Sequence, residues 1–405
     1  MFIGCRGFCA PLVRPDNHLP TKIPGERMSK PHADVIVLGL GGMGAAIANH
    51  LTSRGMSVVG IDRYQPGHRF GSSHGKTRII REAYFEAPEY VPLVRRAYQL
   101  WRELENDTGQ KLLNIHGLLT VGGENSELVN GVLKSSEMYG IACETLDNAE
   151  IRRRFPGAVP SDDMHGVFEP TGGLLNPEQC IEAHLSLARA RGAVIRDGER
   201  VVRWRGDESA VEVKTDQDTY HASHLVVAAG PWTSELLADL NLPLERWRVF
   251  YAHYDSVKRD LFTPDAFPIS LWDTPTGAYY TIPYLPGQGM KVGRHDAGDV
   301  VDPDTMKRTV DVAELRSQTQ TIDRYMPGST GRVLEAETCI YTVTPDHHFI
   351  IDRHPEHANV SYACGFSGHG YKFATVIGEV MADLVEHGRS EHPIGFLSAD
   401  RFTNN

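Results

Sequence analysis

The chain has 405 residues, which at about 100–200 residues per domain predicts two domains rather than one small module. Hydrophobic residues make up 41% and charged residues 23% of the chain, ordinary globular values that exclude a disordered, collagen-like or coiled-coil protein. The formal net charge is -11, which argues against a nucleic-acid partner because duplex binding needs a basic surface.

The 6 cysteines are scattered and form no C-x-x-C pair, so neither a disulfide framework nor a metal site is predicted. The longest apolar run, 35–48, is shorter than the roughly 18–20 residues of a membrane span. We therefore expect a cytoplasmic protein without a membrane partner. Residues 1–31 contain several prolines and no signal-peptide pattern, and they are predicted to be a disordered or over-long tail.

A βαβ unit is predicted at the start of the folded chain. Residues 34–38 indicate a buried strand, and Gly39, Gly41 and Gly44 form a G-x-G-x-x-G turn that opens a helix. A second strand over 57–61 ends at Asp62, where a carboxylate can accept a ribose hydroxyl. Such a turn brings its backbone close to a pyrophosphate. The unit predicts dinucleotide binding, with Gly42, Met43 and Arg63 beside it, but does not choose between NAD and FAD.

Later segments indicate that the nucleotide-binding domain is discontinuous. Buried strands are expected at 225–230 and 360–363, the latter followed by a helix with an apolar face. We predict an α/β (α+β) fold with a Rossmann-like domain made from 32–115, 165–236 and 335–400. Strand-like stretches such as 278–282 and 290–293 predict a second domain, from 116–164 and 237–334, built on a mixed or antiparallel sheet.

The polar segment 71–81 ends in two arginines. If it is extended, Arg78 and Arg81 point to opposite sides, so that one could face a cofactor and the other a substrate. The guanidinium fork of arginine suits a carboxylate. The alternative interpretation is a solvated loop with surface arginines.

Several motifs in order resemble one family. They are residues 71–81 (GSSHGKTRIIR), 90–93 (YVPL), 335–342 (EAETCIYT), 348–352 (HFIID) and 366–373 (FSGHGYKF). From about 32 to 400 the chain resembles the flavin-dependent monomeric sarcosine oxidases and N-methyltryptophan oxidases, within the D-amino-acid-oxidase-like group. The resemblance implies FAD, bound by the Gly39–Gly44 turn and Asp62 at its ADP half. It places further cofactor-binding residues at Gly71, Ser72, Ser73, Thr77, Val201, Gly368, His369, Gly370 and Lys372.

The resemblance also implies a thioether between Cys339 and the flavin 8α-methyl group, although a cysteine in such a strand is more often a buried core thiol. The loop from Gly368 to Lys372 enters a helix, whose positive end could stabilise negative charge at the flavin N1–C2=O edge.

Roles in substrate binding and oxygen reaction follow from the same resemblance. Arg81 and Lys372 are implied to clamp the substrate carboxylate. The amine side of the pocket is implied to be lined by Tyr280, His295 and Tyr341, and a cationic group behind the flavin by Lys291, His74 and Arg78. An unbroken strand would place Lys291 and His295 on one face, whereas a bulge at Gly293 would redirect one of them, and the pattern leaves both possible.

This chain departs from the family pattern at Ser73-His74, Lys76 and Glu82, which changes the charge near the flavin. The expected function is a monomeric oxidase of secondary N-methyl amino acids, with sarcosine, O2 and water giving glycine, formaldehyde and H2O2. The alternatives are an oxidase of a bulkier or cyclic amino acid such as N-methyltryptophan or pipecolate, an NAD-linked dehydrogenase, and a flavin-bearing subunit without turnover. Residues 240–330 match the family less closely, so substrate size stays open.

Overall fold

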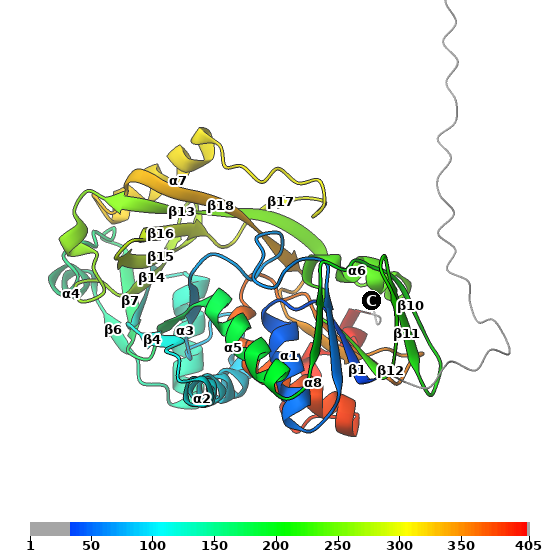
Figure 1. Cartoon of the computed structure of the whole chain (residues 1–405). Helices are drawn as coiled ribbons and strands as arrows, with labels where there is room; N and C mark the ends of the chain where they lie inside the picture. The colour runs from blue at the N-terminus through cyan, green and yellow to red at the C-terminus, as the bar shows by residue number, and fades with distance from the viewer. Residues whose placement is uncertain (1–32, 403–405) are drawn as a thin grey trace, which may run out of the picture.

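The computed structural model describes residues 33–402, so the tail predicted for 1–31 lies outside the described residues. The described chain has two parts that lie side by side, each organised around a large sheet (Figure 1). One part carries the βαβ unit predicted from the glycine motif, and the other carries most of the middle of the chain.

The first sheet has eight strands in the order β10-β11-β12-β1-β2-β9, with β20 paired to β12 and β19 to β20. The strands are β1 (Ala33–Leu38), β2 (Val58–Asp62), β9 (Val194–Asp197), β10 (Val201–Gly206), β11 (Val211–Thr215), β12 (Thr219–Val227), β19 (Ile350–Arg353) and β20 (Val360–Cys364). Strands β20, β12, β1, β2 and β9 pair parallel with one another, whereas β10, β11 and β19 pair antiparallel at the edges. This pairing confirms that distant pieces of the chain meet in one nucleotide-binding sheet.

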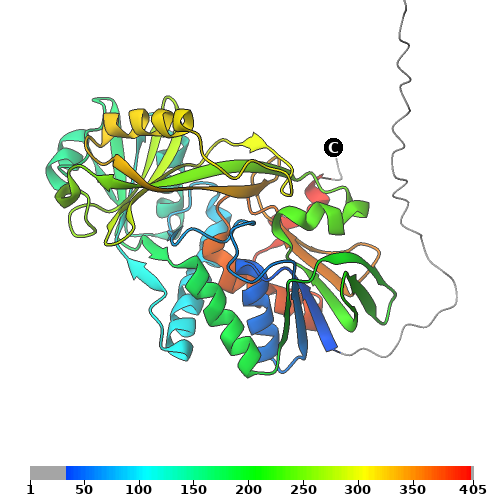
Figure 2. The same cartoon turned by 45° about the horizontal axis from the view of Figure 1, so that its top comes forward.

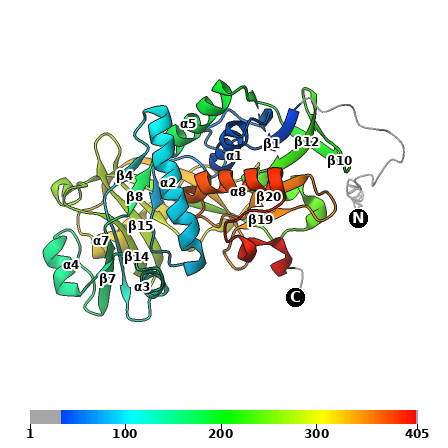
Figure 3. The ribbon, with the colours of Figure 1, turned by 90° about the horizontal axis from the view of Figure 1, so that it is seen from below.

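Helices cover one face of this sheet. They are α1 (Gly42–Ser53), α5 (Pro177–Ala190) and α8 (Ala374–His387), with α2 (Val91–Thr108) beside α8 (Figure 3). Parallel strands are buried on both faces, which is why β1 reads as a continuous apolar run. Helix α1 begins where the glycine turn was expected to open it, and Gly55, at φ 84°, follows its end.

The second sheet has nine strands in the order β17-β13-β16-β15-β14-β5-β7-β6, with β18 paired to β13. Its strands are β5 (Leu118–Gly123), β6 (Glu144–Leu146), β7 (Met164–Glu169), β13 (Glu245–Ser256), β14 (Ile269–Thr274), β15 (Gly277–Leu285), β16 (Gly289–Arg294), β17 (Asp299–Val300) and β18 (Gly331–Val343). All neighbours are antiparallel except β5 and β14. The predicted mixed sheet is therefore confirmed.

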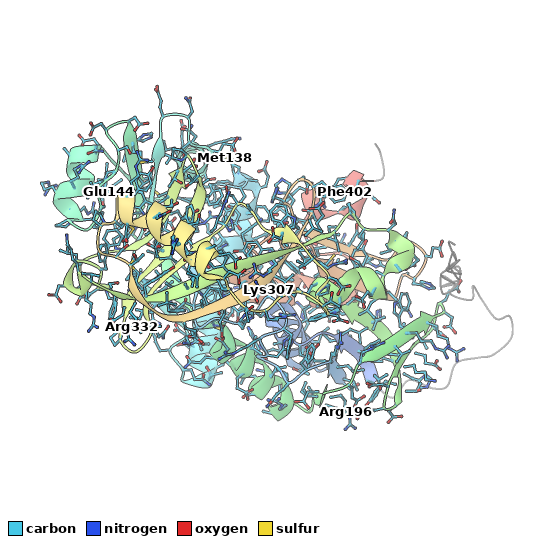
Figure 4. The ribbon with its side chains drawn as sticks, turned by 90° about the horizontal axis from the view of Figure 1, so that it is seen from above. Met138, Glu144, Arg196, Lys307, Arg332 and Phe402 are labelled. Atoms are coloured by element: carbon cyan, nitrogen blue, oxygen red, sulfur yellow. The ribbon has the colours of Figure 1, made fainter. Side chains whose placement is uncertain are left out.

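Helix α7 (Val312–Tyr325) lies across the outer face of the second sheet (Figure 2). Helix α4 (Asn148–Arg154) lies at its far end, α3 (Glu127–Tyr139) packs against β5 and β7, and the short α6 (Thr233–Leu236) lies near the first sheet. From above, the labelled Glu144 and Arg332 mark the far end of the second sheet, and Arg196 and Phe402 mark the nucleotide side (Figure 4). Among residues 33–402, no helix is both long and apolar enough to cross a membrane.

The strand pairing bears on the expected domain boundaries. Strands β7 and β18 both pair within the nine-stranded sheet, so divisions at 164/165 and 334/335 would cut through them. The division into two domains stays a prediction.

A small sheet joins the two parts. Strand β8 (Gly173–Leu175) pairs antiparallel with both β3 (Arg78–Ile80) and β4 (Leu113–Ile115). This pairing holds the segment 71–81 in a defined direction, and β3 is the extended stretch that separates the two arginines. The segment is therefore not a freely solvated loop.

Candidate active site

A cavity of about 440 Å³ is lined by residues of both large sheets and of the segment between them. Its lining includes the glycine turn and Asp62 as well as Arg81 and Lys372. Every site residue predicted from the sequence lines this cavity except Gly44 and His74. The residues that do so are Gly39, Gly41, Gly42, Met43, Asp62, Arg63, Gly71, Ser72, Ser73, Thr77, Arg78, Arg81, Val201, Tyr280, Lys291, His295, Cys339, Tyr341, Gly368, His369, Gly370 and Lys372.

The glycine turn is closed so tightly that side chains would not fit. A Cβ on Gly39 would lie 2.5 Å from the carbonyl oxygen of Ala228, and one on Gly44 would lie 1.7 Å from that of Gly39. Gly44 thus holds helix α1 against the turn instead of facing the cavity, as the third glycine of such motifs does. The Asp62 carboxylate accepts the backbone N–H of Leu40 at 2.7 Å and is fixed beside the turn.

The two arginines of the segment 71–81 diverge, as their spacing predicted. Arg78 donates to the carbonyls of Thr77 and Ser72, both at 2.8 Å. Arg81 has different partners, because its guanidinium forms an ion pair with Glu86 and donates to Ala83 O.

Glu86 is a site residue that the sequence reasoning missed. Burial raises its pKa, but the charges of Arg81, His369 and Lys372 outweigh burial and hold the pKa at about 2. The Arg81 guanidinium therefore already has an anionic partner, its Nη2 lying 2.6 Å from Glu86 Oε1. The only sequence signal was an acid five positions after an arginine, which is common in exposed loops.

Lys372 lies in the same cluster. Its ammonium donates to His369 O at 2.6 Å and lies 3.4 Å from the Tyr84 hydroxyl. Burial, followed by repulsion from Arg81, lowers the pKa of Lys372 to about 7, although Glu86 acts in the opposite direction. The charge of this lysine is therefore sensitive to any anion that enters the cavity.

The side of the cavity near Tyr280, Tyr341 and His295 is uncharged. Burial lowers the pKa of His295 to about 4 and raises that of Tyr280 and Tyr341, so all three are neutral near pH 7. A Cβ on Gly293 would lie 2.4 Å from the Tyr280 ring, and one on Gly368 would lie 2.4 Å from the Tyr341 ring. Both glycines thus leave room for an aromatic wall.

The strand register shows whether β16 has a bulge at Gly293. Gly293 pairs with Tyr251 on one side and Tyr280 on the other without a register shift at this position. Strand β16 therefore runs unbroken through Lys291, and His295 follows directly after its end. Both side chains reach the cavity without a bulge.

Lys291 is fully buried. Its ammonium donates to Gly75 O at 2.7 Å, has Thr77 O and Oγ1 at 3.4 Å, and lies 4.0 Å from the centroid of the Tyr251 ring. Burial, followed by repulsion from Arg78, holds the pKa of Lys291 well below the usual lysine value.

His74, predicted to belong to a cationic group, does not line the cavity, and its role in that group stays a prediction. His74 lies behind the cavity wall, with Nε2 3.0 Å from Thr338 O. Burial is the main cause that lowers its pKa to about 3, so the imidazole is neutral near pH 7. A histidine without an ionised partner loses its charge when buried, which the sequence could not show.

Cys339 is a buried thiol in the cavity wall, contributed by β18. Its sulfur has only long contacts, with Ser72 O at 3.7 Å and Gly71 O at 4.0 Å. Burial raises the pKa of this thiol, and the nearby charges of Arg78 and Lys291 oppose that rise.

Residues 34–384 match the family model described as "FAD dependent oxidoreductase". The chain belongs to this family. The match excludes the NAD-linked dehydrogenase considered above, and the protein is an FAD-dependent oxidoreductase. The cavity fits FAD, because its lining combines a glycine turn with no room for side chains, the Asp62 carboxylate, and the basic residues Arg81 and Lys372.

Relatives within the family are similar over nearly their whole length. Monomeric sarcosine oxidase of Streptomyces avermitilis is 42% identical over 377 residues, which cover 92% of this chain and 98% of that protein. N-methyl-L-tryptophan oxidase of Yersinia pestis is 34% identical over 371 residues, covering 91% and 99%. These matches confirm the family resemblance drawn from the motifs.

Solved structures show the same fold. NikD, an amino acid oxidase essential for nikkomycin biosynthesis, superposes with a TM-score of 0.80 at 24% identity, covering 91% of this chain and 98% of its own. Glycine oxidase from Geobacillus kaustophilus gives a TM-score of 0.76 at 19% identity, with coverage of 91% and 98%. The two-part architecture is thus the fold of these two solved structures.

Proposed function

We propose that the protein oxidises secondary N-methyl amino acids, with sarcosine as its substrate. Sarcosine, O2 and water give glycine, formaldehyde and H2O2. Bound FAD supplies the acceptor for the two electrons of the amine and their route to O2. The observation that carries the proposal is the pair Arg81 and Lys372, two buried basic residues that line the same cavity.

The cavity surrounds the carboxylate and the amine of an amino acid differently. Arg81 and Lys372 bind the carboxylate, and their positive charge orients the substrate in one direction. The uncharged wall of Tyr280, Tyr341 and His295 faces the amine. This wall offers no anion that would form an ion pair with a protonated amine. An amine must be neutral to lose a hydride equivalent, so an uncharged wall favours the reactive form.

Lys291 is proposed to assist the reaction with O2. Negative charge develops on O2 as it is reduced, and a fixed ammonium in a water-poor site stabilises this charge more than the ground state. The carbonyls of Gly75 and Thr77 hold Lys291 in place at the cavity wall. Arg78 adds a second cation on the same side of the cavity.

The flavin is proposed to be covalently attached through Cys339. The thiol lines the cavity, has only long contacts with backbone carbonyls, and lies near two cations that favour its thiolate. A thioether to the 8α-methyl group of the flavin is the attachment that the family motif implies. We further propose a monomeric, cytoplasmic protein without nucleic-acid or membrane partners, and the name of its monomeric relative supports the first part.

A peroxide-coupled screen tests the substrate. We expect H2O2 release with sarcosine to exceed that with N-methyl-L-tryptophan or pipecolate. Dimethylamine, which is sarcosine without its carboxylate, should be turned over poorly, because it leaves both cations without a partner. Faster turnover of one of the bulkier amino acids would replace sarcosine as the substrate. Equal turnover of sarcosine and dimethylamine would contradict the carboxylate clamp, and no peroxide with any amine would contradict an amine oxidase.

A further inference from the structure

Two carboxylates hold the cavity-lining segment by its backbone amides, one at each end of strand β3. Glu178, in the first turn of α5, accepts the N–H of Gly75 at 2.7 Å and of Lys76 at 3.2 Å. Glu169, at the end of β7, accepts the N–H of Glu82 at 2.6 Å and of Ala83 at 3.1 Å. Both acids flank β8, the strand that pairs with β3.

The turn at Gly75 and Lys76 has an uncommon backbone conformation. Gly75 has φ 104° and Lys76 has φ 66°, so two successive residues lie in the left-handed region. A lysine adopts this region at a cost, and it persists where the surroundings compensate. The Glu178 carboxylate provides this compensation, because it accepts both amides that the turn presents on one side.

The same peptide links Glu178 to Lys291. The carbonyl of Gly75 and the N–H of Lys76 belong to one planar trans peptide and point in opposite directions. Glu178 accepts the N–H, while Lys291 donates to the carbonyl oxygen at 2.7 Å. An anion on the N–H side polarises the peptide and makes its carbonyl a stronger acceptor.

We propose that Glu178 is a positioning residue for the reaction with O2, which acts on Lys291 through the Gly75–Lys76 peptide. The inference rests on the proposed role of Lys291. Glu178 does not line the cavity, so it acts through the peptide instead of by contact with substrate or flavin. Glu169 holds the other end of the segment, next to Arg81, and should instead serve the carboxylate clamp.

A pH effect follows from the charges that face Lys291. Arg78 lowers the pKa of this lysine, whereas Glu178, Glu337 and the Cys339 thiol raise it. The neighbouring His74 and His253 are neutral near pH 7, since burial lowers their pKa values to about 3 and about 4. Tyr251, under the ammonium, has a pKa raised by burial. Loss of the Glu178 charge should therefore move the alkaline fall of the oxygen reaction to lower pH.

The test is stopped-flow kinetics of both half-reactions in Lys291→Met, Glu178→Gln and the matched Glu169→Gln. We expect Lys291→Met to slow reoxidation by O2 by at least about 10²-fold, with flavin reduction by substrate changed far less. Glu178→Gln should slow reoxidation by about 10- to 100-fold, the range of a hydrogen bond to a charged group. Glu169→Gln should affect flavin reduction more than reoxidation. The double variant Lys291→Met with Glu178→Gln should be no slower than Lys291→Met alone.

A crystal structure of the Glu178→Gln protein gives a readout that does not depend on turnover. The contact between Gly75 O and Lys291 Nζ, 2.7 Å here, should lengthen or break. If Glu178→Gln does not fold, Glu178→Asp keeps the charge with shorter reach, and an intermediate effect confined to reoxidation is expected.

The outcomes separate the inference from the function it rests on. If Lys291→Met leaves reoxidation unchanged, the proposed role of Lys291 fails. If Lys291→Met slows reoxidation but Glu178→Gln does not, the positioning role of Glu178 is wrong. Equal loss in both half-reactions, or additive effects in the double variant, would show that Glu178 supports the fold generally.

Discussion

The ammonium of Lys372 is held between opposing influences, and its protonation should control how the cavity binds anions. Burial and Arg81 lower the pKa of this lysine to about 7, while Glu86 and Glu169 act against them. A bound carboxylate favours the protonated form, so binding is linked to proton uptake whenever the free lysine is neutral.

Acetate, a carboxylate without an amine, should therefore bind with a pH dependence. Below pH 7 Lys372 is protonated and affinity is at its maximum, whereas above it affinity should fall by up to about tenfold per pH unit. His295 and His369, with pKa values of about 4 and about 3, stay neutral between pH 6 and 9 and do not contribute. The measurement is a flavin absorbance titration with acetate over this range. Lys372→Met should bind weakly at every pH, and an unchanged pH dependence in that variant would assign the effect to another group.

Truncation of Arg81 should weaken substrate binding, and the ion pair between Arg81 and Glu86 affects the size of this loss. Arg81→Ala is expected to weaken sarcosine binding by about 2–5 kcal/mol, because one cation of the clamp is removed and a buried carboxylate is left without its partner. In the double variant Arg81→Ala with Glu86→Gln, the unpaired buried carboxylate is absent. Glu86→Gln alone should bind acetate more tightly, since the guanidinium no longer has a competing anion. Titration of the three variants with sarcosine and acetate measures these changes in affinity. Weaker acetate binding in Glu86→Gln would show that Glu86 positions Arg81 instead of competing with the substrate for it.

The covalent link can be tested by denaturing the protein in acid. With a thioether at Cys339, the yellow colour should precipitate with the protein and appear on it after electrophoresis. Cys339→Ala should contain loose FAD or none. Colour that stays in the supernatant of the parent protein would contradict the attachment. Cys180, which is buried in helix α5 and does not line the cavity, provides the control, and Cys180→Ala should keep its flavin.

At the scale of single elements, the cofactor end depends on how closely α1 approaches the turn after β1. The contact is between backbone atoms, and the missing Cβ of Gly44 makes it possible. Helix α1 also packs against α5 and α8, so a shift at its first turn would be passed to both neighbours. The glycine therefore serves packing and cofactor binding together.

Gly44→Ala should accordingly destabilise the protein and weaken FAD retention. The new Cβ would lie 1.7 Å from Gly39 O, so the helix must move, and overpacking of this kind typically costs about 1–3 kcal/mol. Thermal unfolding and the ratio of flavin to protein measure the two effects. Gly395→Ala is the matched control, because nothing lies within 4 Å of its added Cβ. A Gly44→Ala protein as stable as that control would contradict the close approach.

At the scale of the whole molecule, the site exists because the two sheets share one cavity. The first sheet and the turns after its strands contribute Gly39 and Asp62, and the second contributes Cys339, Tyr280 and Lys291. The long strands β13 and β18 reach from the second part toward the first (Figure 2), which carries Cys339 and Tyr341 to the cofactor side. Either part alone would hold half of the cavity.

Features whose residues lie close together along the chain could be predicted from the amino-acid sequence. The glycine turn, helix α1 and Asp62 lie within one βαβ unit, and the alternation of an extended strand separated Arg78 from Arg81. The family motifs identified the cavity-lining residues in the same way, because each motif is a short continuous segment.

Which buried charges meet, and which groups lose their charge, could be learned only from the folded chain. Glu86 faces Arg81, Glu178 holds the turn beside Lys291, and His74 lies behind the wall as a neutral ring. The first depends on a buried side-chain ion pair, and the other two depend on backbone groups that meet side chains of distant segments. Burial shifts a pKa by several units, and a backbone donor is the same for every residue type, so neither leaves a mark in the sequence.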